Sequence, residues 1–569
     1  MLMLTVVGTG EAQWSRDPRE AIELPGVYNV NLTTDSLGGV FLDGWAASSD
    51  LKTYCLWLDR DGVRHWNNWI DVSPRASETH SSAIALCSEP GELVVAYEVY
   101  WYGQDTTQDV RLQKINTEGE LLWPDSGLAI CETKIRLRHF RYIDDNGEEH
   151  SFPYYPGKVS VLGIVTDNEG GIVVAYTIRG NNEQGTVYEQ LIYAQRVSAE
   201  GELFWGEDGI PIVEREERIL TQCGVVSDYN GGAIFKYAIN RQIGHWGVQR
   251  INCFGERLWS NSGSEYEVGY SADSYAYIAD GRGGVITTGL LRPEGRIQIN
   301  VFHFNAQGEP DWGENDDGIV IVNAPYQARW QDIQIIQTSN DTWFLSWEGN
   351  WYYQPFPLIQ SITIAGEVSW DSPIRSSEGD SIQHSIMGIK SSEAGLYLWQ
   401  DSRDFEGQSS SICTQKIGLE GEKLWINDDI LVLNRRGMEV IELESDNNGG
   451  AFIYMWNNIG YLQYINADGE LGIPLRVNNP GEPLDQRVLT YQIFPNPANQ
   501  TATIFLSSPN VIQTTLSIHD LQGRLIQTNP ILPNQSNVSI NLQSFPSGQY
   551  LIHIESADKQ QAQFLQIMK

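Results

Sequence analysis

The sequence predicts an all-β protein: an eight-bladed β-propeller with four-stranded antiparallel blades, followed by a small immunoglobulin-like β-sandwich. Two hairpin signals each recur eight times along most of the 569 residues. The segments between glycine turns are rich in tryptophan and tyrosine, as strands of β proteins are. No long segment carries apolar residues at the 3.6-residue spacing of a helix, so we expect little helix.

The first hairpin signal is an Asp- or Asn-rich turn with paired glycines that leads into an apolar strand. It occurs as DSLGGVFL at 35, DNEGGIVVAY at 167, DYNGGAIFKY at 228, DGRGGVITTG at 280 and DNNGGAFIYMW at 446, with weaker copies at 89, 340 and 392. Glycine adopts positive φ without a Cβ penalty, and Asp and Asn bond nearby backbone groups. Both residue types therefore favour a tight hairpin.

The second signal is a Gly-Glu turn, usually with a tryptophan four residues after the glycine. Its glycines are Gly62, Gly119, Gly201, Gly255, Gly308, Gly366, Gly421 and Gly469, and the tryptophans are Trp66, Trp123, Trp205, Trp259, Trp312, Trp370 and Trp425. Two hairpins per unit give four strands, and eight such units indicate propeller blades. A single blade cannot bury its own faces, so we expect the tryptophans to pack blade against blade.

The ends of the repeat predict how the ring closes. The eighth unit, NADGELGIPLRV, has the Gly-Glu turn but no tryptophan, whereas GEAQW at 10–14 supplies the missing pattern. We therefore expect residues 13–24 to supply or complete the outer strand of the last blade, which removes two exposed sheet edges. Residues 1–12 look like the end of a signal peptide without its basic start, so we expect the true start codon upstream.

We place the propeller at 13–476, a polar linker at 477–490 and the C-terminal sandwich at 491–569. Within a blade of strands a, b, c and d, the a–b and c–d turns share one face of the disc, here called the turn face. The b–c and d–a connections share the opposite face, here called the variable face. Length differences concentrate on the variable face, so we expect binding there.

Aromatic residues gather in three segments of the variable face: 97–105, an insertion at 137–158, and 347–357, which we interpret as a b–c loop. The insertion is expected to form an extra hairpin. Exposed aromatics are used at protein interfaces and against sugar rings. The expected contact residues are Tyr100, Trp101, Tyr154, Trp351, Tyr352 and Tyr353. The alternative is that these aromatics pack on one another and cover the blade ends.

Composition excludes several function classes. The net charge of −36 argues against nucleic acid as a partner, because an acidic surface repels phosphates. No apolar run is long enough for a membrane span. The six cysteines show no zinc-ligand spacing, and no hydrolase, zinc-protease or phosphate-loop motif occurs. We expect no cofactor; calcium stays open as an alternative, although GENDDG at 313–318 lacks a full calcium-loop pattern.

The C-terminal module carries short strands with four motifs in order: FPNP at 494–497, DLQG at 520–523, PSGQY at 546–550 and a basic last residue. It resembles the type A C-terminal sorting domain of the type IX secretion system of Bacteroidetes-type bacteria. The resemblance places the sorting signal at Pro495, Asn496, Pro497, Gly523, Gly548, Tyr550 and Lys569. It implies Sec export into the periplasm, passage through an outer-membrane translocon, and often domain removal with attachment to surface lipopolysaccharide. A generic immunoglobulin-like accessory domain is the alternative.

The repeat part is similar to repeat propellers of exported bacterial proteins, without a specific family. We favour a secreted or surface-attached binding or adhesion protein for a glycan or a protein. The alternatives are a glycoside hydrolase or lyase acting at the mouth of the central channel, and a purely structural surface component. An enzyme should show a deep pocket with convergent carboxylates, whereas a binder should show a shallow aromatic surface.

Overall fold

The computed structural model is all-β: in the residues that it describes, every regular element is a strand. Those residues are 14–24, 27–46, 52–66, 68–74, 78–101, 107–132, 138–143, 149–181, 187–213, 220–239, 245–267, 276–291, 296–313, 318–325, 329–351, 354–377, 383–402, 411–425, 429–435, 437–472, 491–494, 498–506, 514–520, 524–531, 537–556 and 559–567. Eight sheets form the propeller and two form the C-terminal module.

The first four blades follow one another along the chain. Their strands a, b, c and d run from the hub outward, and blade 3 has one additional strand that precedes its strand a in the sequence. Blade 1 comprises β2 (Val27–Thr34), β3 (Val40–Ala46), β4 (Thr53–Leu58) and β5 (Ile70–Asp71); blade 2 comprises β6 (Glu78–Glu89), β7 (Glu92–Trp101), β8 (Thr107–Asn116) and β9 (Leu128–Glu132); blade 3 comprises β10 (Arg138–Ile143), β11 (Glu149–Thr166), β12 (Ile172–Asn181), β13 (Val187–Val197) and β14 (Ile210–Pro211); blade 4 comprises β15 (Leu220–Ser227), β16 (Ala233–Ile239), β17 (His245–Ile251) and β18 (Ser264–Glu267).

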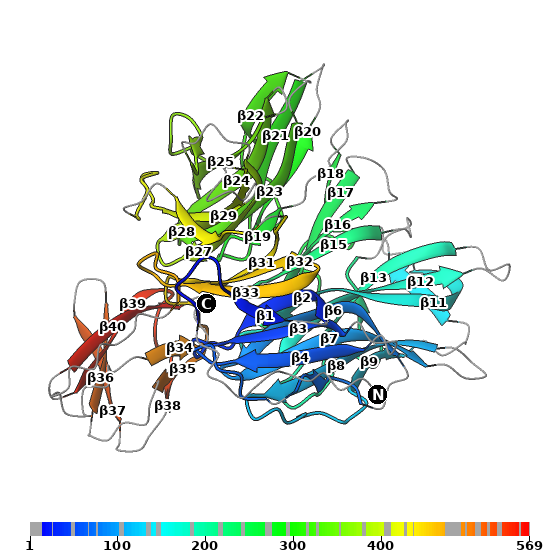
Figure 1. Cartoon of the computed structure of the whole chain (residues 1–569). Helices are drawn as coiled ribbons and strands as arrows, with labels where there is room; N and C mark the ends of the chain where they lie inside the picture. Colours follow the sequence, from blue (N-terminus) through cyan, green and yellow to red (C-terminus); the bar gives the residue numbers. More distant parts are fainter. Residues whose placement is uncertain are drawn as a thin grey trace.

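The remaining blades complete the ring. Blade 5 comprises β19 (Tyr277–Ala279), β20 (Val285–Leu291), β21 (Arg296–Phe304) and β22 (Ile319–Pro325); blade 6 comprises β23 (Arg329–Ser339), β24 (Thr342–Trp351), β25 (Gln354–Thr363) and β26 (Ile374–Arg375); blade 7 comprises β27 (Gln383–Ser391), β28 (Ala394–Asp401), β29 (Ser411–Ile417) and β30 (Ile430–Leu433); blade 8 comprises β31 (Glu439–Ser445), β32 (Ala451–Asn457), β33 (Ile459–Ile465) and β1 (Ile22–Leu24). Figure 1 shows the inner strands gathered around the middle of the disc. The predicted eight-bladed propeller is confirmed.

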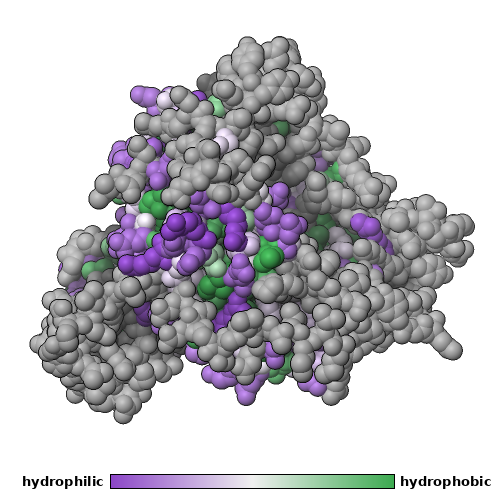
Figure 2. Space-filling model, in the orientation of Figure 1, coloured by the Kyte–Doolittle hydropathy of each residue, from purple (hydrophilic) through white to green (hydrophobic). Residues whose placement is uncertain are grey.

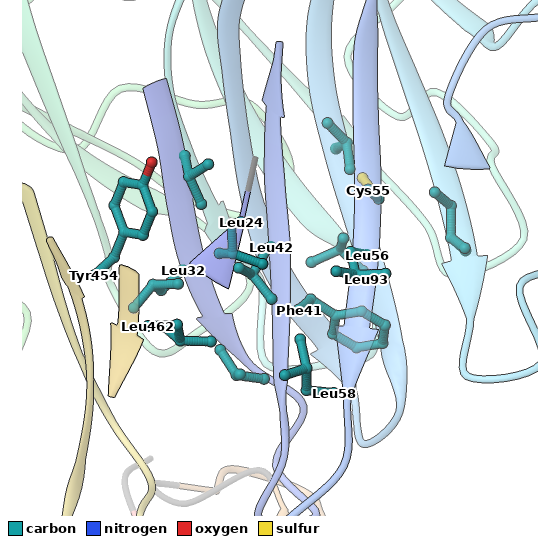
Figure 3. Packing of buried hydrophobic residues seen from close by; sticks show 14 of the residues in the cluster. Leu24, Leu32, Phe41, Leu42, Cys55, Leu56, Leu58, Leu93, Tyr454 and Leu462 are labelled. Atoms are coloured by element: carbon teal, nitrogen blue, oxygen red, sulfur yellow. The ribbon is translucent and has the colours of Figure 1, made fainter. Parts of the chain in front are cut away.

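The N-terminal segment closes the ring, as predicted. Strand β1 lies antiparallel to β33, with Glu23 opposite Tyr461. Leu24 is buried in a core cluster that also contains Leu32 and Leu462, from blades 1 and 8 (Figure 3). The start and the end of the propeller sequence therefore share one blade, and β33 is not left as an exposed sheet edge.

The Asp of the first hairpin signal caps the a–b turn. In blade 3, Asp167 Oδ1 accepts hydrogen bonds from the backbone N–H groups of Glu169 (2.9 Å) and Gly171 (2.8 Å). Asp35, Asp228, Asp280 and Asp446 accept the matching pair of bonds in their own blades. One buried carboxylate thus satisfies two backbone donors that the tight turn leaves without a partner.

The repeating tryptophan joins each blade to the next, as predicted. Trp259 of blade 4 donates from Nε1 to the backbone oxygen of Ala306 in blade 5, at 3.1 Å. Its ring covers Gly308, where an added Cβ would lie 2.4 Å from the indole. The same pairing joins Trp14 to Gly62, Trp66 to Gly119, Trp123 to Gly201, Trp205 to Gly255, Trp312 to Gly366, Trp370 to Gly421 and Trp425 to Gly469. Trp14 therefore serves as the missing tryptophan of blade 8.

The C-terminal module is a two-sheet sandwich, as predicted. Its strands are β34 (Tyr491–Phe494), β35 (Thr501–Leu506), β36 (Thr514–Asp520), β37 (Leu525–Ile531), β38 (Asn537–Asn541), β39 (Gly548–Ser556) and β40 (Lys559–Ile567). One sheet has the order β34-β35-β38 and the other β37-β36-β39-β40. Alternate residues such as Ile504, Leu516 and Ile552 point inward and form its core.

Two further features concern membrane-spanning helices and the cysteines. None of the described segments forms a helix long and apolar enough to cross a membrane. Among the cysteines whose side chains the structure describes, Cys55, Cys131 and Cys413 are buried, and Cys253 is partly buried. These residues behave as small apolar side chains in the blades.

Candidate functional site

The variable face is built from strand ends that run further than predicted. Strand β7 continues to Trp101, and β24 continues to Trp351 and pairs there with Gln354. The interpretation of 347–357 as a b–c loop is therefore wrong over most of its length. The alternation of large aromatic residues in this segment is a strand pattern, and Trp347 is fully buried in the core of blade 6.

Blade 3 carries the predicted extra hairpin. Strand β10 pairs with the first part of the 18-residue β11, and Arg138 lies opposite Tyr154. The second part of β11 is the inner strand of the blade, where Thr166 pairs with Ile172 next to the turn. The hairpin therefore projects on the variable face, beyond the inner strand, and makes blade 3 a five-stranded sheet.

Two hydrogen bonds fasten this hairpin strand to blade 2. Gln108 Oε1 accepts the N–H of Val159 at 3.2 Å, and Glu98 Oε1 accepts the N–H of Val161 at 3.1 Å. Glu98 is 3% exposed, so its carboxylate is committed to this contact. Blades 2 and 3 thus form one sector of the variable face.

The predicted contact residues fall into two separate parts of the ring. Tyr100 and Trp101 end β7 in blade 2, and Tyr154 lies on β11 in the adjoining blade 3. Trp351 ends β24 in blade 6, which is diametrically opposite blade 2 in an eight-membered ring. Tyr352 and Tyr353 lie outside the described residues. The strands therefore place the first three positions in adjoining blades and the fourth in the opposite blade.

Sequence reasoning missed a pocket at the hub. It has a volume of about 410 Å³ and is lined by Ala276, Tyr277, Ile333, Gln334, Ile335, Ile336, Met387, Gly388 and Leu443. These residues come from or adjoin the inner strands of blades 5 to 8, a few positions before the a–b turns. The pocket therefore lies toward the turn face. A run such as IIQ at 335–337 indicates a buried strand but not the empty space beside it.

The lining of this pocket combines apolar side chains with a comparable share of polar surface. Tyr277 and Gln334 carry its polar side chains, and Gln334 Oε1 accepts the N–H of Gly388 at 2.7 Å. Among the residues that the structure describes, no group of three or more His, Cys, Asp or Glu side chains could hold a metal ion. The described lining contains no carboxylate and no histidine, the side chains most often used for proton transfer.

Buried acids lie near the hub at the boundary between blades 8 and 1. Burial raises the pKa of Glu442 to about 7 and that of Glu444 to about 7. Glu444 Oε1 accepts the backbone N–H of Thr34 in blade 1, at 3.3 Å. Burial also raises the pKa of Asp43 to about 7, although Asn31 Nδ2 donates to its Oδ2 at 2.9 Å. Three buried acids with raised pKa values, Glu442, Glu444 and Asp43, therefore lie beside the ring seam. The sequence pattern did not predict them.

The turn face carries ion pairs between turn aspartates and strand c. Arg196 pairs with Asp167 at 2.9 Å, and Arg250 pairs with Asp228 at 3.1 Å. Each Arg also donates to a backbone oxygen of the next blade, as Arg196 does to Cys253. These charged groups hold adjacent turns together and are part of the scaffold.

In blade 5 a histidine takes the place of the arginine. His303 Nε2 lies 3.0 Å from Asp280 Oδ2, and Nδ1 lies 2.6 Å from Asp311 Oδ1. Burial acts to lower the pKa of His303, but the two carboxylates outweigh it and raise the pKa above its usual range. The ring therefore bridges the a–b and c–d turns of this blade, and in its protonated form it donates to both carboxylates.

The predicted sorting residues are only partly within the described chain. Gly548 begins β39, and Tyr550 is 8% exposed, with its hydroxyl donating to the oxygen of Pro546 at 3.0 Å. Tyr550 also packs on Phe545. Pro495, Asn496, Pro497, Gly523 and Lys569 lie outside the described residues.

The C-terminal module matches a known family. Residues 492–568 fit the model of the secretion system C-terminal sorting domain. The chain is thus an exported β-propeller protein with a sorting domain of the type IX secretion system. That domain implies contact with the type IX machinery and attachment to, or release from, the cell surface.

No curated protein matches the chain in sequence. Among solved structures, a eukaryotic initiation factor has a TM-score of 0.40 at 11% identity over 80% of this chain and 89% of that chain. A prolyl oligopeptidase B from Galerina marginata has a TM-score of 0.41 at 9% identity over 78% of this chain and 55% of that chain. An ulvan lyase of polysaccharide lyase family 25 has a TM-score of 0.36 at 10% identity, over 70% and 94%. We draw no functional argument from these similarities.

Proposed function

We propose that the propeller is a non-catalytic binding or adhesion module that meets a glycan or a protein outside the cell. The observation that carries the proposal is the sector of blades 2 and 3, where the β10–β11 hairpin projects from the variable face beside the end of β7. No other blade in the described residues has a fifth strand. Such a departure from the repeat is where function is expected in a repeat protein.

The residue types in this sector suit recognition of a neutral or polar ligand. Tyr100, Trp101 and Tyr154 are contributed by two adjoining blades. Aromatic side chains on rigid strands offer large contact area at a low cost in conformational entropy. We propose Trp351 as part of a second contact area on the far side of the ring.

None of the described residues that line the hub pocket is an acid or a histidine, which also supports binding over catalysis. General acid–base chemistry on a polysaccharide needs two carboxyl groups, or a base and an acid, facing the substrate. The polar side chains of the described lining are those of Tyr277 and Gln334, and the Gln334 amide is already bonded to Gly388. We therefore do not propose the hub as the site of a lyase or hydrolase.

A binding assay with matched variants tests the proposal. The purified chain is applied to a glycan array and to a panel of extracellular-matrix proteins, together with Trp101→Ala, Tyr154→Ala and Trp351→Ala. We expect each of the first two changes to weaken binding at least about tenfold, the cost of one lost aromatic contact. Phe254→Ala, at an 80% exposed turn-face residue, is the control and should bind normally.

Binding that survives all three substitutions would contradict the assignment of the site. Turnover of any polysaccharide by the purified chain, measured by release of reducing ends in parallel, would overturn the non-catalytic interpretation.

A further inference from the structure

We propose that the sorting domain docks on the turn face of the propeller, on the a–b turns of blades 3, 4 and 6. The surface that receives it consists of Glu169, Asn230 and Asn340, one residue from each turn. The partner surface is one edge of the sorting domain, formed by Asn499, Gln500 and Gln566. The sorting domain is therefore the partner of the turn face.

Two contacts join the sorting domain to blades 3 and 4. Gln500 Nε2 donates to Glu169 Oε1 at 3.3 Å, and Asn499 Nδ2 donates to Asn230 Oδ1 at 3.2 Å. Glu169 and Asn230 occupy the same third position of the DxxGG turn in successive blades. Adjacent residues of the sorting domain thus contact equivalent positions of adjacent blades.

A third contact lies two blades further round the ring. Asn340 Nδ2 donates to Gln566 Oε1 at 2.9 Å. The turn that carries Asn340 is held by an ion pair between Arg282 of blade 5 and Asp341 of blade 6. Arg282 occupies the third turn position of blade 5, so this residue fixes the neighbouring turn.

The docking edge is rigid within the sorting domain. The N–H of Ala498 donates to the oxygen of Gln566 at 2.8 Å, which fixes the start of the Asn499–Gln500 segment beside β40. The N–H of Leu542 donates to the oxygen of Gln500 at 2.7 Å. Three side chains that lie on two segments are therefore presented together, which lowers the entropy lost on docking.

The turns of the other blades differ at the matching position. The third turn residue of blade 1 is Leu37, which is 39% exposed. That of blade 8 is Asn448, which is turned back on its own turn, with Nδ2 donating to the oxygen of Asp446 at 3.3 Å. The arc from blade 3 to blade 6 is therefore the part of the turn face that fits the polar edge.

Docking would orient the disc. The sorting domain lies on the turn face, over the arc from blade 3 to blade 6, so the variable face points away from the sorting domain and from whatever holds it at the cell surface. This consequence for ligand access rests on the proposed function, whereas the docking contact itself does not. Three contacts between uncharged amides or an amide and a carboxylate indicate a weak, reversible interface that depends little on salt.

Site-directed crosslinking of the full chain tests the docking. Asn340→Cys with Gln566→Cys is compared with Asn448→Cys with Gln566→Cys, both in a Cys253→Ser background, by the rate of reaction with a short bis-maleimide. Both pairs share the same linker, so tethering alone predicts equal rates. We expect the first pair to react at least about tenfold faster.

A second variant separates a specific contact from chance proximity. Adding Asn499→Ala and Gln500→Ala should slow crosslinking of the first pair to the rate of the control pair. Equal rates for the two pairs, or a fast rate that survives these alanines, would overturn the proposal. Ligand binding measured on the same variants reports on the proposed function separately, because none of these residues lies on the variable face.

Discussion

Each repeating tryptophan packs against a glycine of the next blade. The ring of Trp259 lies against Gly308, which has φ 78° and leaves no room for a Cβ. A glycine in such a position serves two purposes, since it allows the left-handed turn and it admits the indole. Gly206 has φ 82° but has no atom within 4 Å of an added Cβ, so it serves only the first purpose.

This difference gives a matched pair of substitutions. Gly206→Ala should lower the free energy of unfolding by about 1–2 kcal/mol through backbone strain alone. Gly308→Ala should cost about 1–3 kcal/mol more, because the methyl group also displaces Trp259. Urea unfolding followed by far-ultraviolet circular dichroism measures both. Equal losses would show that the tryptophan contact contributes little.

His303 makes stability depend on pH in a defined direction. Its pKa is raised in the folded chain, so the stabilisation from Asp280 and Asp311 is complete below the ordinary histidine value of 6.5. It is lost as pH rises through the raised pKa. His303→Gln should therefore destabilise the chain at pH 5.5 and much less at pH 9. A loss that is the same at both pH values would contradict this role.

At the scale of elements, the seam between blades 8 and 1 combines a borrowed strand with buried acids. Gln463 Nε2 donates to the oxygen of Glu20 at 3.1 Å, so strand c of blade 8 holds the N-terminal segment. Trp14 donates from Nε1 to the oxygen of Arg60 in blade 1 at 3.0 Å. The segment that contains Trp14 and leads into β1 thus makes contacts for blade 8 that, in the other blades, come from residues continuous in sequence with the rest of the blade.

Trp14 should therefore be as important as an internal tryptophan. Trp14→Ala and Trp259→Ala should each lower the free energy of unfolding by about 3–5 kcal/mol. Phe254→Ala, at an 80% exposed residue, should change it by less than about 0.5 kcal/mol. A Trp14→Ala variant as stable as the Phe254→Ala control would mean that the segment is not required for closure.

The seam acids make the free energy of unfolding fall as pH rises, which is the opposite of the effect of a carboxylate whose pKa is lowered on folding. Burial raises the pKa of Glu444 from 4.5 to about 7, so the folded chain keeps a proton that the unfolded chain releases. Stability contributed by this group therefore falls as pH rises from about 4.5 to 7. Its carboxyl accepts a bond from Thr34, which a Gln side chain can also accept.

Glu444→Gln should consequently stabilise the chain at pH 8, by up to about 3 kcal/mol, and should have little effect at pH 4. Glu23→Gln, at an exposed carboxylate, is the control and should change little at either pH. Unfolding midpoints at the two pH values measure the effect. Destabilisation by Glu444→Gln at pH 8 would show that the carboxylate is needed in its charged form.

At the scale of the whole molecule, the sequence predicted what repetition encodes. The Asp of each DxxGG turn, the glycine of each Gly-Glu turn and the following tryptophan recur because every blade needs the same contacts. The ring closure was predictable for the same reason, since Trp14 completes a pattern that the eighth unit lacks. These residues are determined by local turn chemistry and by one neighbour.

Features that differ between blades were predicted less well. The aromatic segment ending at Trp351 continues a strand, because strand length on the variable face is set by pairing with Gln354 and not by turn residues. The hub pocket depends on how four inner strands fit together. The raised pKa of Glu444 depends on burial between two blades that lie at opposite ends of the sequence.

The two faces of the propeller have different contacts. One face carries turn geometry that is repeated from blade to blade, and it contacts the sorting domain. The other carries the blade 2 and blade 3 sector and the end of β24. This division depends on the eight blades forming one closed ring, with β1 as the outer strand of blade 8.

A disulfide across the seam tests that ring most directly. Glu23 and Tyr461 are opposite each other in the β1–β33 pair, and Leu358 and Arg375 are opposite each other in the β25–β26 pair of an internal blade. Cysteines at either pair are within the span of a disulfide if the strands are paired. If the ring is closed by β1, both double variants should oxidise to a similar extent in the native chain. Oxidation of the internal pair without oxidation of Glu23→Cys with Tyr461→Cys would contradict the closed ring.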